Sequence, residues 1–279
     1  MGTIDRRGKE VGCVGSIIMV RGRGFEIVCE IEPPTRPDLM HVRHQIGVLS
    51  SVASAFLIPD NHIGRATVSS VAVAHEVEQM GGRSIACLNA RDRNLLGLRR
   101  DLLTAAAYGV DQFLFVYGDR PSSGARTGQL TVHSMIDELR AFPSIHQGVP
   151  APPFRVGVVA GPGPLPSWKH EADSLFAQVQ FSLEDFLRWR SEIAFDGPVY
   201  AGVMVVPSVS MARKISADID QLAIPEPWLE AIEQDPEAGV RLACELVVSI
   251  KESGAFNGVH LIPVSKYRAV AADLEARLG

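Results

Sequence analysis

The chain has 279 residues, of which 46% are hydrophobic and 21% charged, so it has ample material for a folded core and is not intrinsically disordered. Its net charge of -5 argues against a nucleic-acid-binding or anionic-membrane surface, which would need clustered lysine and arginine. No apolar run reaches the roughly 18 residues of a membrane span, and the N-terminus has no apolar signal-peptide core. We therefore expect a cytoplasmic protein.

Eight short runs rich in β-branched and aromatic residues recur along the chain. They cover residues 25–32, 54–60, 83–90, 112–119, 154–161, 176–182, 198–206 and 258–264. Continuous apolar runs of this kind are typical of parallel strands that are covered on both faces. The sequence therefore predicts eight parallel strands.

Helical patterns lie between these runs. Apolar stripes at helical spacing are formed by Leu39, Val42, Ile46, Leu49 and Ala53, by Leu95, Leu98, Leu102 and Ala106, by Phe186, Trp189 and Ile193, and by Tyr267, Val270, Ala271, Leu274 and Leu278. We interpret the stripes as core-facing helix surfaces rather than cofactor-binding ones. Eight strand–helix units in about 250 residues fit a single (β/α)8 TIM barrel. An open doubly wound sheet is the alternative, but the first strand ends in "EPPTRPD", without the glycine-rich phosphate loop of that fold.

The predicted domain organisation is one catalytic barrel over residues 25–279. An N-terminal segment, residues 1–24, precedes it and contains a candidate barrel-bottom strand in "CVGSIIMV". The segment "PEPWLEAIEQDPEAG", residues 225–239, is interpreted as a proline-rich loop of the eighth unit. A cover over the barrel mouth, or a protein contact, is the alternative for that segment.

Cysteines and histidines do not form a metal-ligand pattern. Cys13, Cys29, Cys87 and Cys244 are widely spaced, without a CxxC pair, and are interpreted as buried reduced thiols. His41 and His44 have metal-like spacing, but they lie among apolar residues of the first predicted helix. We expect them to lie at the surface or to pack between helices, and we expect no metal.

Polar residues gather where the predicted strands end. They are Glu30, Glu32, Asp60, Asn61, His62, Asn89, Tyr117, Asp119, Gln178, Gln180, Ser265 and Lys266. Because active sites of such barrels lie at the carboxyl ends of the strands, these residues predict an acid- and amide-rich site. An acid that is desolvated there, with a second acid nearby, can keep its proton near neutrality and act as a general acid. The alternatives for Glu30 or Glu32 are an arginine pair or a loop cap.

Three stretches, "CEIEPP", "ACLNARDRNLLGLRRDLLTAAAYGVDQFLFVYGDRP" and "AQVQFSLEDFLRWR", resemble the methylenetetrahydrofolate reductase family in the same order along the chain. The resemblance runs from about residue 25 to the C-terminus. It implies that Glu30 is the family's proton donor and that Asp119, in "VYGD", lies near the pterin. It further implies that Gln178 binds the substrate, and that Lys266 stands where the family has a folate-contacting arginine.

The reaction implied is reduction of 5,10-methylenetetrahydrofolate to 5-methyltetrahydrofolate. Protonation of N10 by Glu30 would open the five-membered ring, and Asp119 would stabilise the resulting iminium cation at N5. Gln178 would bind the pterin edge, and Lys266 the glutamyl tail. Glu32 stands where the family has an aromatic residue, and its role is left open. One alternative is that its negative charge only tunes Glu30 by like-charge repulsion.

The flavin contacts of the family are altered here. Ser84 replaces a histidine, Tyr117 replaces an arginine, and "AGPGPLPSW" replaces the segment that embraces the cofactor. The resemblance is therefore to the shorter, flavin-independent branch, with FAD absent and NADH favoured over NADPH as hydride donor. Tyr117, Asn61 and His62 would then border the nicotinamide.

Several alternatives remain open. They are an FAD-dependent reductase, a non-catalytic folate-binding barrel, and a lyase or hydrolase on the same barrel. A lyase would need a Schiff-base lysine at a strand end, where only Lys266 is found. An NADPH phosphate would need an arginine cluster, for which Arg65, Arg91, Arg93 and Arg120 are the candidates. No oligomeric state is predicted.

Overall fold

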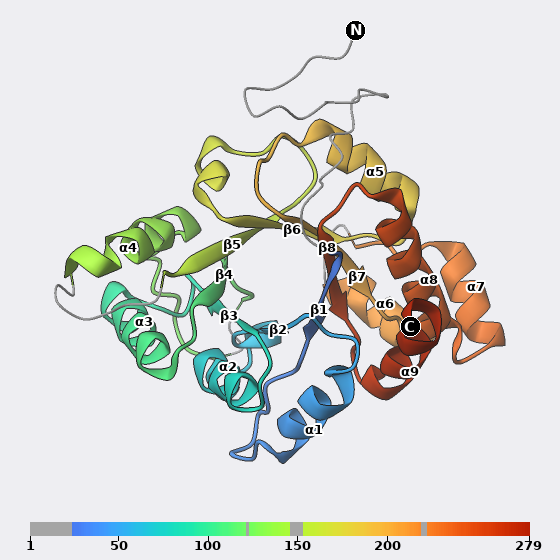
Figure 1. Ribbon diagram of the computed structural model, residues 1–279, viewed down its shortest axis with the longest axis horizontal. Helices are drawn as coiled ribbons and strands as arrows, with labels where there is room; N and C mark the ends of the chain where they lie inside the picture. The colour runs from blue at the N-terminus through green and yellow to red at the C-terminus, as the bar shows by residue number, and fades with distance from the viewer. Residues whose placement is uncertain (1–23, 121–122, 146–152, 219–221) are drawn as a thin grey trace, which may run out of the picture.

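The computed structural model describes residues 24–120, 123–145, 153–218 and 222–279. Its eight strands form a closed barrel in which each strand pairs in parallel with the next, and β8 pairs with β1 (Figure 1). The strands are β1 Glu26–Glu30, β2 Ala55–Ile58, β3 Ser84–Asn89, β4 Gln112–Val116, β5 Arg155–Ala160, β6 Ser174–Val179, β7 Val199–Met204 and β8 Gly258–Ile262. The predicted (β/α)8 barrel is thus confirmed. The largest difference between a predicted and an observed strand start is at β6, which begins two residues before the predicted start at residue 176.

Helices surround the barrel on its outside (Figure 1). They are α1 Met40–Leu49, α2 Ser70–Gln79, α3 Leu95–Tyr108, α4 Val132–Ile145, α5 Leu183–Glu192, α6 Val209–Asp218, α7 Glu226–Gln234, α8 Ala238–Ser253 and α9 Tyr267–Leu278. Two short 3-10 helices, η1 His62–Gly64 and η2 Ser167–Glu171, lie in the loops after β2 and β5. The four predicted apolar stripes fall on α1, α3, α5 and α9, where they bury their core-facing residues.

Two hydrophobic clusters divide the barrel into an outer and an inner layer. The outward-facing strand residues pack against the helices in one large cluster. The inner cluster consists of Val28, Ala55, Leu57, Ile85, Cys87, Leu114, Phe176 and Tyr200. Its members alternate along the strands, and the rings of Phe176 and Tyr200 stack with centroids 4.9 Å apart. The interior is therefore filled by side chains, and a ligand can enter only above this layer.

The interpretation of residues 225–239 as a loop is wrong. These residues form α7, a short connection and the first two residues of α8, and they belong to the link between β7 and β8, the seventh unit. Pro225 caps the start of α7 and Pro227 lies in its first turn, where proline is well tolerated. Trp228 and Ile232 share one buried face of the helix, and the Trp228 ring contacts that of Phe181 at 5.0 Å. Figure 1 shows α7 on the outside, beside α8.

Cys29, Cys87 and Cys244 are free and buried, as expected, whereas Cys13 lies outside the described residues. The candidate strand at residues 13–20 also lies outside them. No helix in the described part of the chain is long and apolar enough to cross a membrane.

His41 and His44 serve helix packing, as predicted. Both rings meet the ring of Tyr267 edge-on at 5.8 Å, and His44 Nε2 lies 2.6 Å from a guanidinium nitrogen of Arg268. These contacts join α1 to α9.

Candidate active site

Glu30 ends β1 and faces the barrel interior, two residues above the inward-facing Val28. Its side chain is 17% exposed, and Oε2 lies 3.2 Å from Nε2 of His260. Among the described residues, the group at ion-pair distance from Glu30 is thus an imidazole, not the arginine considered from the sequence.

His260 lies on β8 and was missed by the sequence analysis. Its side chain is 12% exposed, and its ring meets that of Phe176 edge-on at 5.9 Å. Nε2 is buried and has no partner with full hydrogen-bond geometry among the described residues, although Glu30 is within ion-pair distance. The sequence feature that could have indicated His260 is a polar residue inside the apolar run "GVHLIPV". It alternates with its neighbours along β8, so it lies on the same inward face as Gly258 and Ile262.

A buried network links the ends of β2 and β3. The Asp60 carboxylate, 4% exposed, accepts hydrogen bonds from the backbone and side-chain nitrogens of Asn89 at 3.0 and 2.7 Å, and pairs closely with Arg93. Arg93 also bonds to Asp101 at 2.8 Å. Burial alone would lower the pKa of Arg93, but the two carboxylates outweigh it and raise that pKa. Asp60 is therefore neutralised by Arg93 and acts as a structural anchor.

The pKa of the Cys87 thiol is shifted by burial and by the charged groups of the site. Burial, followed by the negative charges of Glu30 and Asp60, raises the pKa of its thiol well above the usual value, with Arg93 opposing. The thiol therefore stays protonated and is not a nucleophile.

Asp119 lies beyond the end of β4 and is exposed. Its Oδ2 accepts a 2.9 Å hydrogen bond from the backbone amide of Ile63, in the loop after β2. Asn61 in the same loop donates to Asp92 at 3.2 Å, while His62 is exposed. Asn61 and Ile63 have positive φ angles of 49° and 56°, which is strained for the β-branched Ile63.

Tyr117 lies in the same sector of the barrel mouth and is 50% exposed. The Arg91 guanidinium lies 4.7 Å from the centre of its ring. Two of the four arginines considered for an NADPH phosphate already have other contacts. Arg91 is stacked on Tyr117, and Arg93 is buried in ion pairs with Asp60 and Asp101. The structure brings Asn61, His62, Tyr117 and Asp119 to the ends of β2 and β4.

Gln178 and Lys266 lie on the other side of the mouth. Gln178 is exposed near the end of β6, two residues after Phe176, whose ring contacts His260. Lys266, directly before α9, pairs with Glu237 at 3.2 Å, so a ligand carboxylate would compete with Glu237 for it. Glu32 is exposed beyond the end of β1, so it does not share the buried environment of Glu30.

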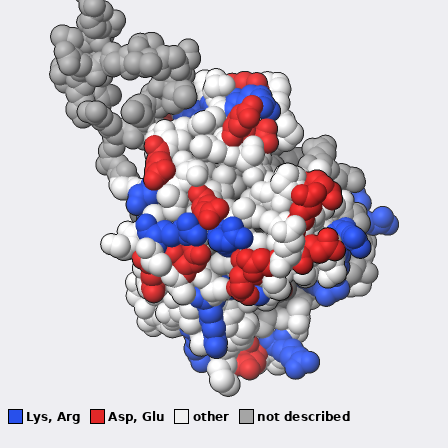
Figure 2. Space-filling view, turned by 90° about the vertical axis from the view of Figure 1, so that its right-hand side faces the viewer, with Lys and Arg blue, Asp and Glu red and all other residues white. Residues whose placement is uncertain are grey.

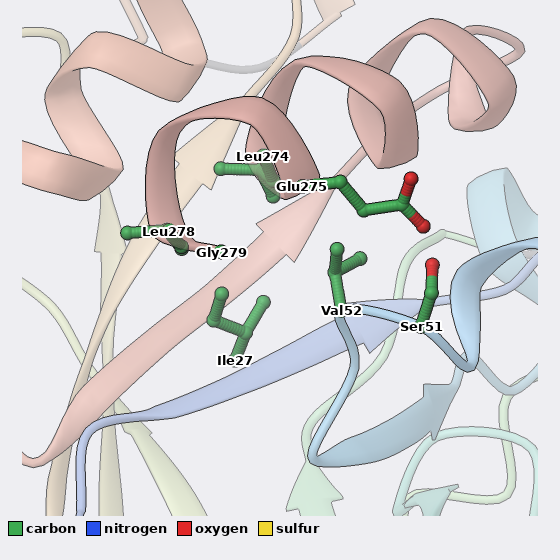
Figure 3. A pocket seen from close by; sticks show the side chains of 7 residues that line it. All are labelled: Ile27, Ser51, Val52, Leu274, Glu275, Leu278 and Gly279. Atoms are coloured by element: carbon green, nitrogen blue, oxygen red, sulfur yellow. The ribbon is translucent and has the colours of Figure 1, made fainter.

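Two pockets lie close to the barrel. The first, of about 280 Å³, is lined by Ile27, Val52 and the end of α9 (Figure 3). It adjoins the loop between α1 and β2, at the end of the barrel opposite the strand carboxyl ends. The second, of about 230 Å³, is lined by residues 160–166 and Lys169 and lies at the carboxyl end of β5. Burial lowers the pKa of Lys169, whose Nζ donates to the Val159 carbonyl at 2.8 Å.

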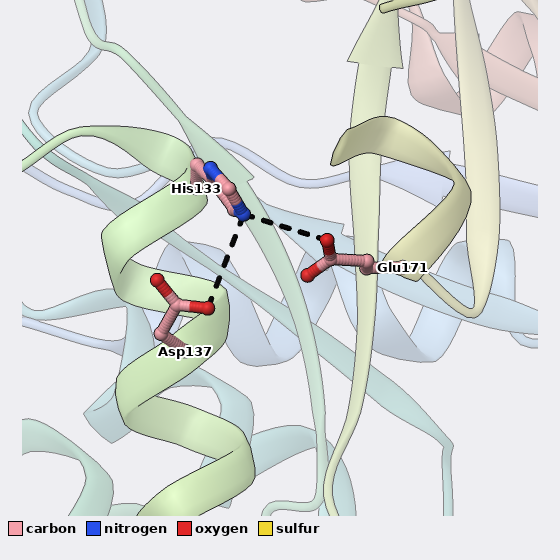
Figure 4. Close-up of side chains that lie close together, drawn as sticks. All are labelled: His133, Asp137 and Glu171. Carbon is pink, nitrogen blue, oxygen red and sulfur yellow. Dashed lines mark ion pairs between the residues drawn. The ribbon is translucent and has the colours of Figure 1, made fainter. Parts of the chain in front are cut away.

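One group of possible metal ligands occurs among the described residues. His133 and Asp137 on α4 face Glu171 on η2, with His133 Nε2 3.9 and 3.5 Å from the two carboxylates (Figure 4). All three are exposed and lie outside the barrel. The predicted absence of a metal stays a prediction.

The face shown in Figure 2 carries acidic and basic side chains that are interspersed.

Comparison with known proteins identifies one family. The sequence model described as methylenetetrahydrofolate reductase matches residues 168–277, which include β6, β7 and β8. No curated protein matches the chain.

Solved structures with the same fold are distant in sequence. An uncharacterized protein from Clostridium thermocellum that binds two copies of 5-methyl-5,6,7,8-tetrahydrofolic acid is 14% identical, with a TM-score of 0.59 over 91% of this chain and 96% of that one. A mutant tryptophan synthase alpha-subunit from Pyrococcus furiosus is 12% identical, with a TM-score of 0.55 over 90% and 96%. EDTA monooxygenase from Chelativorans sp. BNC1 is 9% identical, with a TM-score of 0.51 over 91% and 94%.

At these identities the structural neighbours establish the barrel alone. The family match covers residues 168–277, which include the third of the three resembling stretches, whereas the other two stretches precede that range. Over residues 168–277 the chain matches the methylenetetrahydrofolate reductase family, as its motifs predicted.

Proposed function

We propose that the protein reduces 5,10-methylenetetrahydrofolate to 5-methyltetrahydrofolate by direct hydride transfer from NAD(P)H, with NADH favoured and no bound flavin. The observation that carries this proposal is Glu30, a largely buried acid in the barrel interior that is paired with an imidazole. The family match over residues 168–277 and the folate-binding neighbour from Clostridium thermocellum support a folate substrate.

The first step needs a proton at N10 of the folate. Glu30 donates it, the bond between N10 and the methylene carbon breaks with its electron pair going to N10, and an iminium forms at N5. A general acid at such a position contributes about 10²–10⁴ in rate. Because Glu30 lies above the filled interior layer, a pterin at the mouth of the barrel can reach it.

The second step is hydride addition to the iminium carbon. Asp119, whose Oδ2 is fixed by the Ile63 amide, carries the negative charge that stabilises this cation. Gln178 binds the pterin edge. Lys266 exchanges Glu237 for the glutamyl tail of the folate.

Three features support a flavin-free reaction. Ser84 replaces a family histidine, and its backbone and hydroxyl groups both donate to Glu78 at 2.8 and 2.6 Å, so the side chain is committed to α2. Tyr117, which replaces an arginine, is stacked under Arg91. The connection from β5 to β6 contains η2 as its only helical element. In this proposal Tyr117, Asn61 and His62 border the nicotinamide.

The test is NADH oxidation with methylenetetrahydrofolate, with and without added flavin. We expect activity without flavin, sequential two-substrate kinetics and stereospecific transfer of deuterium from labelled NADH. A purified protein that is yellow from bound flavin and follows ping-pong kinetics would indicate the FAD-dependent reductase instead. Folate binding without turnover would indicate a non-catalytic barrel.

A further inference from the structure

We propose that Arg91 binds the pyrophosphate of the nicotinamide dinucleotide, and that Tyr117 holds the Arg91 guanidinium in place for this contact. The inference rests on the proposed function, in which Tyr117 borders the nicotinamide. It assigns a residue to the charged part of the co-substrate.

The backbone of Arg91 is fixed at the mouth of the barrel, two residues beyond the end of β3. Its amide donates to the Tyr117 carbonyl at 3.1 Å, just as the Ala90 amide donates to the Val116 carbonyl at 3.0 Å, so the pairing of β3 with β4 continues as far as Arg91. The Arg91 carbonyl accepts hydrogen bonds from the amide and the hydroxyl of Thr127 at 3.2 and 3.4 Å. Arg91 is therefore held between β4 and the loop that follows it.

The side chain of Arg91 is oriented by Tyr117. The guanidinium carbon lies 4.7 Å from the centre of the Tyr117 ring, and a cation–π contact of this kind favours one position of the guanidinium. Nε of Arg91 is buried and has no hydrogen-bond partner. Because the contact with the ring uses no oxygen acceptor, the guanidinium keeps N–H donors for the oxygen atoms of a ligand.

Arg91 differs in this respect from the other partly buried arginines of the described residues. Arg83, Arg93 and Arg99 are each paired with a carboxylate, and Arg190 donates to two backbone carbonyls. Arg91 forms neither kind of contact with a described residue. A guanidinium that is partly desolvated and not paired with a carboxylate favours the binding of an anion.

The acidic residue closest to Arg91 in the chain is bound elsewhere. Asp92 accepts hydrogen bonds from the side-chain amides of Asn61 and Asn89 at 3.2 and 3.1 Å. On the other side of the mouth, Lys266 is already paired with Glu237. Arg91 is therefore the better placed of these two cations for an anion that extends from the nicotinamide.

A phosphate group is the anion that fits best. The planar fork of a guanidinium matches two phosphate oxygens, and such contacts are strengthened by charge. In a nicotinamide dinucleotide, one ribose separates the nicotinamide from the pyrophosphate. The 2′-phosphate of NADPH lies further away, on the ribose of the adenosine. An arginine beside Tyr117 is thus placed for the pyrophosphate, which NADH and NADPH share.

The test compares NADH with dihydronicotinamide riboside, a hydride donor that lacks phosphate. In Arg91→Gln we expect KM for NADH to rise by about 10- to 100-fold, because a charge-assisted contact is lost. The kcat/KM for dihydronicotinamide riboside should stay within about twofold of the wild type. Arg91→Lys, which keeps the charge but not the fork, should give an intermediate loss with NADH. Arg155→Gln, at an exposed position at the start of β5, is the matched control and should leave both donors unaffected.

Three results would overturn the proposal. An equal loss with both donors would mean that Arg91 acts only by supporting Tyr117 and the fold. A loss with NADPH but not with NADH would assign Arg91 to the 2′-phosphate. Unchanged kinetics of Arg91→Gln with NADH would leave the reductase reaction intact and remove Arg91 from it.

A second measurement does not need activity. Calorimetric titration with ADP-ribose, which has the pyrophosphate but no nicotinamide, should show binding to the wild type that is about tenfold weaker or more in Arg91→Gln. Equal binding to both proteins would also overturn the proposal. If ADP-ribose and NADH bind in a manner that depends on Arg91, but methylenetetrahydrofolate is not reduced, the pyrophosphate site is present and the proposed function is wrong.

Discussion

Asp119 and Ile63 are 56 residues apart in the chain, yet a 2.9 Å hydrogen bond joins the Ile63 amide to the Asp119 carboxylate. The bond ties the loop after β4 to the loop after β2 at the mouth of the barrel. It fixes one oxygen of Asp119. It also draws Asn61 and His62, the neighbours of Ile63, toward the same sector.

Asp119→Asn should separate the charge of Asp119 from its contact with Ile63. Asparagine keeps an oxygen for the Ile63 amide but removes the negative charge that faces the developing cation. We expect kcat to fall by about 10²-fold or more, with folate binding changed little. Steady-state kinetics and folate titration measure the two effects. Full turnover in Asp119→Asn would remove Asp119 from the mechanism.

Ile63→Gly should relieve backbone strain. Ile63 has φ of 56° and its side chain is 53% exposed, so glycine loses little packing there. We expect the free energy of unfolding to stay equal or to rise by about 1 kcal/mol in urea titration. Leu103→Gly, at an exposed position within α3, is the control and should lose about 1 kcal/mol. A comparable loss in Ile63→Gly would show that the side chain stabilises the loop.

Arg93→Ala should destabilise the barrel strongly. The change leaves Asp60 buried without its guanidinium partner, which costs about 3–5 kcal/mol, whereas Asp101 keeps its ion pair with Arg100 at 2.9 Å. Arg188→Ala is the matched control, since its ion pairs on α5 are exposed, and it should cost less than about 1 kcal/mol. Urea titration of both variants checks the comparison. Equal losses would mean that the buried network does not anchor the site.

The three described cysteines should resist alkylation while the protein is folded. Burial raises the pKa of Cys29 and of Cys244 to about 12, and that of Cys87 well above its usual value. At pH 8 a thiol with a pKa near 12 is ionised in about one molecule in 10⁴, and the thiolate is the reacting form. Mass spectrometry after iodoacetamide treatment should find these residues labelled only in unfolded protein. Labelling of native Cys87 at the rate of glutathione would contradict its placement.

The barrel could be predicted because each of its strands is indicated by a short run of neighbouring residues in the sequence. Each run of β-branched residues buries both faces, and the parallel order follows from the alternation with helices. The helix α7 was missed because three prolines in and around the segment suggested a loop. Two of them stand where proline is compatible with a helix start, and only the burial of Trp228 and Ile232 reveals the helix.

The site was predicted only in part. Strand ends indicated Glu30 and Asp119 as polar residues of the mouth, and the structure places both there. The partners of these residues come from distant parts of the chain, as His260 and Ile63 show, and a single sequence carries no local signal for such contacts. The same reason explains why the pairing of Lys266 with Glu237, 29 residues away, was not foreseen.

Single-turnover oxidation of NADH by Glu30→Gln, measured by stopped-flow absorbance with 5,10-methylenetetrahydrofolate, tests the proton donor most directly. Glutamine preserves the size and polarity of the side chain but has no proton to give. The proposed mechanism predicts a rate at least about 100-fold below that of the wild type, with the folate dissociation constant within a few fold. A rate within about tenfold of the wild type would show that N10 receives its proton from another source.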